Sequence, residues 1–244
     1  MQIGHERAEE ARAAMIELFP EGFEEVERSS GVELAAYTDA AGEERLWHFF
    51  GSGDGADVEA GWEDRWRSFH RPIRVGRLWV GPPWETPPED VLTVVVDPGR
   101  AFGTGAHPTT RLCLELLQEL EPGSLVDVGC GSGVLTVAAA RLGHAPVLGV
   151  DIEAPSIEAT LENAARNGVD LEVQLVGPDD RLPDAQAAVA NISIEAIRAL
   201  PERVQAEALI TSGYFLSESP DLDGYERVHR RTYEGWAADL HRRA

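Results

Sequence analysis

The fold of this chain is decided by one short stretch of sequence, Leu125-Val126-Asp127-Val128-Gly129-Cys130-Gly131-Ser132-Gly133. A run of four residues with a buried-strand pattern leads directly into a glycine-rich turn, and the apolar segment after it has the pattern of a helix. Glycines at this point allow backbone angles that other residues avoid and let a ligand approach the backbone closely. The stretch therefore predicts a strand, turn and helix with a ligand at the turn.

The spacing of the glycines and two acidic residues indicates what kind of ligand this is. The turn reads Gly-x-Gly-x-Gly, whereas dinucleotide-binding turns read Gly-x-Gly-x-x-Gly and leave room for a pyrophosphate. Asp127, just before the turn, would repel a pyrophosphate and attract an ammonium group. Asp151 follows Gly129 by 22 residues, at the end of the next strand, where a carboxylate can accept hydrogen bonds from ribose hydroxyls. We therefore expect a nucleoside that carries an amino acid, bound by Gly129, Gly131 and these carboxylates.

Outward from this stretch, strands and helices alternate in the pattern of a parallel sheet covered on both faces. We expect a C-terminal antiparallel hairpin formed by 225–233 and 236–241 across Glu234-Gly235. The other predicted strands are 125–128, 147–150, 171–176, 187–190 and 208–211, and the predicted helices are 109–120, 133–142, 155–167 and 194–200.

The N-terminal part of the sequence predicts a small α/β unit. A helix is expected over 6–19, with Ala8, Ala11, Met15 and Leu18 on one face, and strands near 23–26, 32–37 and 46–50. The glycine-rich run 51–55 is the expected boundary, and a helix over 58–70 places Trp62 and Trp66 on one face. Further strands are expected at 78–80 and 92–96.

Two more segments have the composition of functional loops. Residues 97–110 are rich in glycine, proline and threonine, which predicts a flexible cover with Thr109 or Thr110 near the N-cap of the next helix. His107 in this segment is read either as catalytic or as an ordinary loop histidine. Asn191 ends the fourth core strand, where open α/β sheets place ligands. Its amide oxygen could accept a hydrogen bond from an incoming amine, or the residue could only cap the turn.

Composition narrows the class of protein. The formal net charge is -22, and all 21 basic residues are arginine. An acidic field of this size disfavours direct binding to nucleic acid and favours a basic macromolecule, although it could serve solubility alone. The absence of lysine excludes Schiff-base and P-loop mechanisms. Two cysteines, Cys113 and Cys130, are too few for a disulfide framework and lack zinc-site spacing, so no metal is expected. No membrane helix or signal peptide is expected, which makes the cytoplasm the default location.

Taken together, these segments resemble one family, the bacterial ribosomal protein lysine methyltransferases that modify the eleventh protein of the large subunit. The resemblance extends from about Trp62 to the C-terminus, and the loop motif is its most specific part. It rests on 62–66, 97–110, 127–135, 149–152, 162–169, 190–192 and 211–213.

The resemblance implies a seven-stranded, doubly wound, Rossmann-like class I methyltransferase domain preceded by a small α+β ferredoxin-like domain. The expected limits are 1–56 for the substrate-recognition domain, 57–75 for a linker helix and 76–244 for the catalytic domain. It implies S-adenosylmethionine as the cofactor, contacted by Thr110, Gly129, Asp151 and Asn191, with Phe102 near the adenosine or methyl pocket. His107 belongs to the motif without an assigned role.

The expected reaction is direct methyl transfer to a neutral lysine or N-terminal amine of a large-subunit ribosomal protein, with Asn191 aiming the amine. A monomer that acts without nucleic acid or membrane is expected. Three alternatives stay open at this point: a related methyltransferase with another protein substrate, a non-catalytic cofactor-binding module, and a nicotinamide-dependent oxidoreductase, which would need a third glycine at another spacing.

Overall fold

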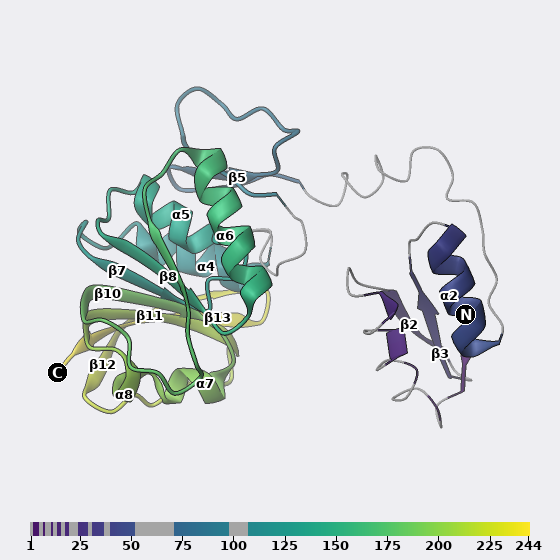
Figure 1. Cartoon of the computed structure of the whole chain (residues 1–244). Helices are drawn as coiled ribbons and strands as arrows, with labels where there is room; N and C mark the ends of the chain where they lie inside the picture. Colours follow the sequence, from purple (N-terminus) through teal and green to yellow (C-terminus); the bar gives the residue numbers. More distant parts are fainter. Residues whose placement is uncertain are drawn as a thin grey trace. The chain divides into compact units, whose positions relative to one another are not determined.

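The computed structural model describes residues 2–4, 7, 11, 14–15, 18–19, 24–28, 31–36, 40–51, 71–97 and 107–244, drawn in colour in Figure 1. The chain divides into two compact units, residues 1–64 and 65–244. Most of the expected linker helix, including Trp62 and Trp66, lies outside the described residues, as does Phe102. The domain limits expected from the sequence therefore stay predictions, apart from the end of the linker discussed below.

The larger unit is built on a seven-stranded sheet, as the resemblance implies. Its strand order is β12-β13-β11-β10-β7-β8-β9, with β10, β7, β8 and β9 parallel and β13 antiparallel to β11. The bounds are β7 Leu125–Val128, β8 Val147–Asp151, β9 Glu172–Leu175, β10 Ala185–Asn191, β11 Ala206–Phe215, β12 Tyr225–Tyr233 and β13 Trp236–Arg243. This arrangement confirms the class I methyltransferase fold.

Helices cover both faces of this sheet (Figure 1). Helices α4 (Pro108–Leu117), α5 (Val134–Arg141) and α6 (Ala154–Asn167) pack on one face, while α7 (Ile194–Arg198) and α8 (Leu200–Arg203) pack on the other. Strand β7, inside the sheet, is buried at all four positions, which is why its sequence, apolar apart from Asp127, does not alternate with exposed polar residues. The sequence predicts one helix over 194–200, whereas the structure has two short ones. Ala199 is the C-cap of α7, and Pro201 stands in the first turn of α8.

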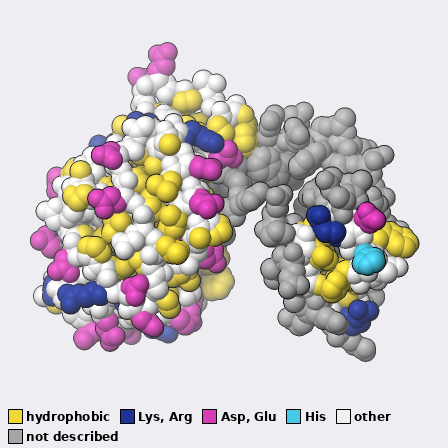
Figure 2. All heavy atoms as spheres, viewed as in Figure 1, with side chains coloured by type: hydrophobic (Ala, Val, Ile, Leu, Met, Phe, Trp, Pro, Cys, Tyr) yellow, Lys and Arg dark blue, Asp and Glu magenta, His cyan; other side chains and the backbone are white. Residues whose placement is uncertain are grey.

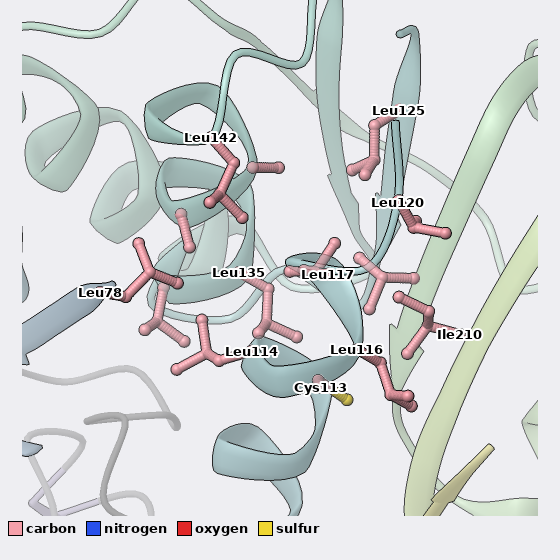
Figure 3. Packing of buried hydrophobic residues seen from close by; sticks show 14 of the residues in the cluster. Leu78, Cys113, Leu114, Leu116, Leu117, Leu120, Leu125, Leu135, Leu142 and Ile210 are labelled. Atoms are coloured by element: carbon pink, nitrogen blue, oxygen red, sulfur yellow. The ribbon is translucent and has the colours of Figure 1, made fainter. Parts of the chain in front are cut away.

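Helix α4 lies at the centre of the larger apolar core. Figure 3 shows its leucines, among them Leu114, packed between Leu135 of α5, Leu78 and Ile210 of β11. Leu114 is fully buried, so a change to alanine is expected to cost about 2–5 kcal/mol of stability. This packing fixes the position of the first turn of α4, which reaches the functional site.

The antiparallel end of the sheet closes with the predicted hairpin. Glu234 and Gly235 join β12 to β13 with φ angles of 48° and 84°, both in the left-handed region that tight hairpin turns require. Strand β11 is longer than the sequence predicted and changes register between Ser212 and Tyr214 where it pairs with β13. The extra residues carry Phe215 to the same edge as Trp236, its partner on β13.

A small three-stranded sheet precedes the main one in the chain. Strand β4 (Ile73–Val75) pairs with β5 (Leu78–Gly81), which is parallel to β6 (Leu92–Val95). Within the expected linker helix over 57–75, only residues 71–75 are described, and 73–75 form strand β4 instead of a helix. Residues 73–75 pair with β5 across the turn at 76–77, and this antiparallel pairing replaces the hydrogen bonds of a helix.

Helix α6 holds β6 through two asparagine side chains. Asn167 accepts a hydrogen bond from the N–H of Val95 at 2.8 Å and donates to its carbonyl at 2.7 Å, as a neighbouring strand would. Asn163 accepts from the N–H of Asp97 at 3.1 Å and donates to the carbonyl of Ser132 at 2.9 Å. The segment 162–169 therefore joins the end of β6 to the glycine-rich turn.

In the smaller unit, the described residues form a three-stranded antiparallel sheet of order β1-β3-β2 with a helix. Its elements are β1 Gln2–Ile3, β2 Glu24–Arg28, β3 Gly31–Ala35 and α2 Ala40–Phe50. The expected strand over 46–50 is wrong, because these residues end α2, and Leu46 and Phe50, four positions apart, both pack on the small core. The ferredoxin-like arrangement stays a prediction.

No helix in the described part of the chain is both long enough and apolar enough to cross a membrane.

Candidate functional site

The glycine-rich turn after β7 adopts a backbone that side chains would disturb. Gly129, Gly131 and Gly133 have φ angles of 77°, 54° and 79°. A Cβ atom at Gly129 would come within 2.4 Å of Cγ2 of Ile192, and one at Gly133 within 2.8 Å of Cγ2 of Thr160. The turn is therefore restricted to glycine both by its backbone angles and by space.

Asp151 ends β8 directly beside this turn. One of its carboxylate oxygens accepts a hydrogen bond from the N–H of Gly131 at 2.9 Å, and the other accepts from the N–H of Glu153 at 3.0 Å. The residue is only 9% exposed. Each oxygen keeps a further lone pair, so the carboxylate is held in place and can still accept from a ligand hydroxyl.

A cavity of about 600 Å³ opens where the parallel strands end, a volume suited to a small-molecule ligand. It brings together five residues that the sequence singled out: Thr110, Gly129, Gly131, Asp151 and Asn191. The rest of its wall is mostly apolar or acidic and includes Val128, Val134, Leu135, Val150, Ile152, Glu153, Val176, Asp179, Ile192, Ser193 and Arg203.

Asn191 and Thr110 meet at one end of the cavity. The amide nitrogen Nδ2 of Asn191 donates to Oγ1 of Thr110 at 3.3 Å. The threonine is buried in the first turn of α4 and the asparagine is half-buried at the end of β10. With its nitrogen engaged in this way, Asn191 has its oxygen Oδ1 left to accept from a ligand.

Asp127 lies beneath the turn, and the described wall of the cavity does not include it. Its oxygen Oδ2 accepts a hydrogen bond from the hydroxyl of Thr136 at 2.6 Å, while Oδ1 is buried and has no hydrogen-bond partner among the described residues. Burial raises the pKa of Asp127 from its ordinary value of 3.8 to about 7, and the nearby charge of Asp151 also raises it. Unpaired buried carboxylate oxygens are uncommon and call for a partner that the side chains alone do not provide.

His107 is the N-cap of α4. Its Nδ1 accepts a hydrogen bond from the N–H of Thr109 at 3.3 Å and lies 2.7 Å from the hydroxyl of the same residue. Its ring meets the ring of Trp236 edge to face, with the centroids 4.9 Å apart. Burial lowers the pKa of His107 below its ordinary value, so the ring is neutral near pH 7. Its described contacts are a helix cap and an aromatic neighbour, outside the described cavity wall.

The residues that complete the cavity on the β9 side had no signal in the sequence patterns considered above. Arg203 of α8 donates to the carbonyl of Gly177 at 3.2 Å and to that of Asp180 at 3.2 Å, which holds this loop beside the cavity. Asp180 in turn accepts from the N–H of Gly177 at 2.7 Å. The position of residues 177–180 immediately after a core strand could have identified this loop. Its contact with Arg203 depends on tertiary packing.

The electrostatics of the cavity select against phosphate. Asp151, Glu153 and Asp179 contribute carboxylates to the wall, and the guanidinium of Arg203 is engaged by backbone carbonyls. A diphosphate would meet repulsion here, whereas sugar hydroxyls and a cationic group would find acceptors. The site is therefore suited to a cationic nucleoside and poorly suited to a nicotinamide dinucleotide.

Comparison with known proteins identifies relatives of this chain. The family model described as ribosomal protein L11 methyltransferase (PrmA) matches residues 21–231. A relative of that name in Shewanella sediminis is 46% identical over 158 residues, which are 62% of this chain and 54% of the relative. Another in Photobacterium profundum is 42% identical over 175 residues, or 67% of this chain and 60% of the relative. The chain thus spans a little over half the length of these curated relatives.

A solved structure gives the same result for the fold. The ribosomal protein L11 methylase of Lactobacillus delbrueckii subsp. bulgaricus superposes with a TM-score of 0.64 at 29% sequence identity. The match covers 71% of this chain and 99% of that one.

Proposed function

The chain belongs to the ribosomal protein L11 methyltransferase family, and on this premise we propose that it transfers methyl groups from S-adenosylmethionine to amines of ribosomal protein L11. Membership of this family supports methyl transfer as the reaction and S-adenosylmethionine as the donor. The observation that carries the proposal for this chain is the cavity in which the glycine turn, Asp151 and the Thr110–Asn191 pair face one ligand volume.

The residues of the cavity fit the proposed cofactor, whose sulfonium supplies the methyl group when it is bound. Asp151 would accept from the ribose hydroxyls while its other contacts hold the turn. Gly129 and Gly131 would present backbone groups to the amino-acid part. The unpaired oxygen of Asp127 would be satisfied by an ammonium group, directly or through water. Ile152 and Val176 offer apolar surface for the base, and Phe102 keeps the role near the adenosine that the resemblance assigns to it.

Asn191 is proposed to aim the substrate amine. With Nδ2 bound to Thr110, its Oδ1 can accept a hydrogen bond from the amine N–H and orient the nitrogen lone pair. A lysine ammonium must first lose a proton, because its ordinary pKa is near 10.4. The apolar wall around Val134, Leu135 and Ile192 removes water from the amine, which favours the neutral form. We do not propose that His107 transfers a proton, because its Nδ1 is already hydrogen-bonded to Thr109 at the cap of α4.

The substrate is proposed to be a basic large-subunit ribosomal protein, bound by residues 1–56 while residues 76–244 carry out the transfer. A net charge of -22 favours a basic protein partner over nucleic acid. Figure 2 shows acidic side chains around the visible face of the larger unit, with hydrophobic side chains between them. We propose that it acts in the cytoplasm, where ribosomal proteins would be its substrates, and as a monomer.

Methyl transfer to purified L11 tests this function. Wild-type protein should label L11 from radioactive S-adenosylmethionine, and Asn191→Ala should lower kcat roughly 100-fold with little change in affinity for S-adenosylhomocysteine. Gln174→Ala, an exposed polar position on β9, is the control and should be as active as the wild type.

Two results would contradict the proposal in different ways. Cofactor binding without label in L11 or any other ribosomal protein would indicate a non-catalytic binding module. Label in a different protein would keep the chemistry and change the substrate.

A further inference from the structure

Three rings lie in series at the edge of the sheet beyond the cavity: those of His107, Trp236 and Phe215, called the aromatic wall below. The ring centroids of Trp236 and Phe215 are 4.5 Å apart with the planes 28° from parallel, and His107 meets Trp236 edge to face at 4.9 Å. Phe215 is 55% exposed, and the next residue, Leu216, is 56% exposed. Large apolar side chains at such exposure, placed together, indicate a contact surface more often than isolated ones do.

The sheet register places this wall on the amine side of the cavity. Asn191 pairs with Ser212 on β11, which pairs with Ala238 on β13. Trp236 therefore lies two strands from Asn191, roughly 10 Å across the sheet, and two residues beyond its level, roughly 7 Å further out. A lysine side chain, which extends roughly 6 Å from its Cα, can bridge much of this span when it enters past the wall.

The wall and Asn191 also face the same side of the sheet. Side chains alternate along a strand, so Asn191 projects with Val189, and Trp236 projects with Ala238 and Leu240. Val189, Ala238 and Leu240 belong to the core on the α4 face, and Trp236 packs against it. Asn191 reaches the same face through its hydrogen bond to Thr110 of α4. The helix that carries Thr110 begins at His107, so its first turn connects the wall to the Thr110–Asn191 pair.

The charges around the wall suit a cation. The carboxylate of Glu218 accepts a hydrogen bond from the N–H of Phe215 at 2.8 Å, which fixes a negative charge at its base. The ring of His107 is kept neutral by burial, so it adds no opposing charge near pH 7. Arg111, the next residue after Thr110, lies over the ring of Tyr233 and pairs with Glu115 at 3.6 Å.

From this arrangement we propose that the aromatic wall is the entry surface for the substrate lysine, with its alkyl stem against Trp236 and its ammonium passing the ring faces toward Asn191. This inference rests on the proposed function and identifies the residues that recognise the amine-bearing side chain. Ring faces attract alkylammonium and methylammonium groups alike. The wall thereby accepts a lysine that already carries a methyl group as readily as an unmodified one.

Steady-state kinetics of the full chain with purified L11 and S-adenosylmethionine test the wall. Trp236→Leu, which keeps an apolar side chain and removes the ring, should raise KM for L11 roughly tenfold. Phe215→Ala should raise it several-fold, and Trp236→Phe should stay near the wild type. The affinity for S-adenosylhomocysteine and kcat should be unchanged. Val228→Ala, an exposed apolar position on β12, is the matched control.

Thermal unfolding separates recognition from stability, because Trp236 also touches the core, whereas Phe215 is largely exposed. An unchanged KM in both Trp236→Leu and Phe215→Ala would overturn the inference, as would an equal rise in Val228→Ala or a loss confined to kcat. If wild-type protein transfers no methyl group to L11, the proposed function fails and the wall fails with it. Transfer by the wild type with unaffected wall variants refutes the wall alone.

Discussion

Two buried aspartates on the same sheet are compensated in opposite ways. Asp127 on β7 and Asp239 on β13 are 1% and 0% exposed. Asp239 accepts a hydrogen bond from the hydroxyl of Tyr214 at 2.9 Å and lies near Arg230 and Arg227, at 3.4 and 3.8 Å. Oδ1 of each carboxyl has no hydrogen-bond partner among the described residues, but Oδ1 of Asp239 lies 3.4 Å from Nε of Arg230, whereas Asp127 has only the hydroxyl of Thr136, on its other oxygen.

The two carboxyls differ in how far the protein itself compensates their charge. Around Asp239, the protein itself supplies hydrogen-bond and ionic partners, which join β11, β12 and β13 into one unit. Around Asp127, the described residues supply one hydroxyl and no cationic side chain, and the nearby charge of Asp151 is of the same sign. Burial raises the pKa of both carboxyls. At Asp239, the hydroxyl of Tyr214 and two guanidinium groups oppose this rise. At Asp127, Thr136 alone opposes it, and the charge of Asp151 adds to it.

The largest expected effect is the loss of the compensated carboxylate. Asp239→Ala removes the shared partner of Tyr214, Arg227 and Arg230 and should lower the free energy of unfolding by about 3 kcal/mol. Urea denaturation measures this, and the affinity for S-adenosylhomocysteine should stay at the wild-type value. The control is Asp184→Ala, whose carboxylate is 66% exposed and 3.7 Å from Arg181. A similar small loss in both variants would erase the distinction between the two regions.

The uncompensated carboxylate should appear in the pH dependence of stability. The pKa of Asp127 is about 7 in the folded chain and near its ordinary value when unfolded. The folded state therefore holds more protons between these values, so the contribution of Asp127 to stability is fully present below pH 4 and is lost as the pH rises through 7. Between pH 5 and 7, the wild type should lose about 2 kcal/mol more than Asp127→Asn, measured by urea denaturation without ligand. Parallel profiles would show that Asp127 does not titrate in this range.

His241, near the compensated carboxylate, should give the opposite slope. Burial, followed by the charges of Arg227 and Arg230, lowers the pKa of His241 to about 4. The neutral ring contributes stability that is present above the unfolded pKa of 6.5 and is lost as the pH falls toward 4. From pH 6 to 5, the wild type should lose about 1 kcal/mol more than His241→Gln. A loss of the same size in the variant would assign the acid sensitivity to other groups.

The smallest effect is expected on the outer strand. Glu119 accepts from His229 and from Arg231, both at 2.7 Å, but these pairs are largely exposed. Glu119→Gln should therefore cost about 0.5 kcal/mol, and 1 M salt should remove most of the difference. A cost comparable to that of Asp239→Ala would mean that exposure does not separate the two sites.

Local patterns in the sequence predicted most of the sheet and part of the site. Buried strands such as 125–128 are indicated by short, mostly apolar runs. The hairpin is indicated by the glycine turn at Glu234-Gly235. Residues 46–50 have aromatic side chains that favour a strand, but Leu46 and Phe50, four positions apart, pack on the same core as the end of helix α2. Partners chosen by tertiary contact had no local signal, as with Arg203 and the loop at Gly177.

The site shows the same limit. Asp151 and Asn191 were found because the ends of parallel strands share one edge of the sheet, a property of the topology. His107 could not be separated from a helix cap by its sequence, and its geometry is that of a cap. The burial of Asp127 was also beyond reach, since a strand buried on both faces gives no alternation to show which way a side chain points.

The amide of Asn163 is a short link with a consequence for motion. It holds the carbonyl of Ser132 in the glycine turn and the N–H of Asp97 at the end of β6. Local opening of either segment breaks a bond that the other segment depends on, so the two should fluctuate as one cooperative unit. Slowed hydrogen exchange at the turn would then be accompanied by slowed exchange at the N–H of Asp97, although Asp97 lies well before the turn in the sequence.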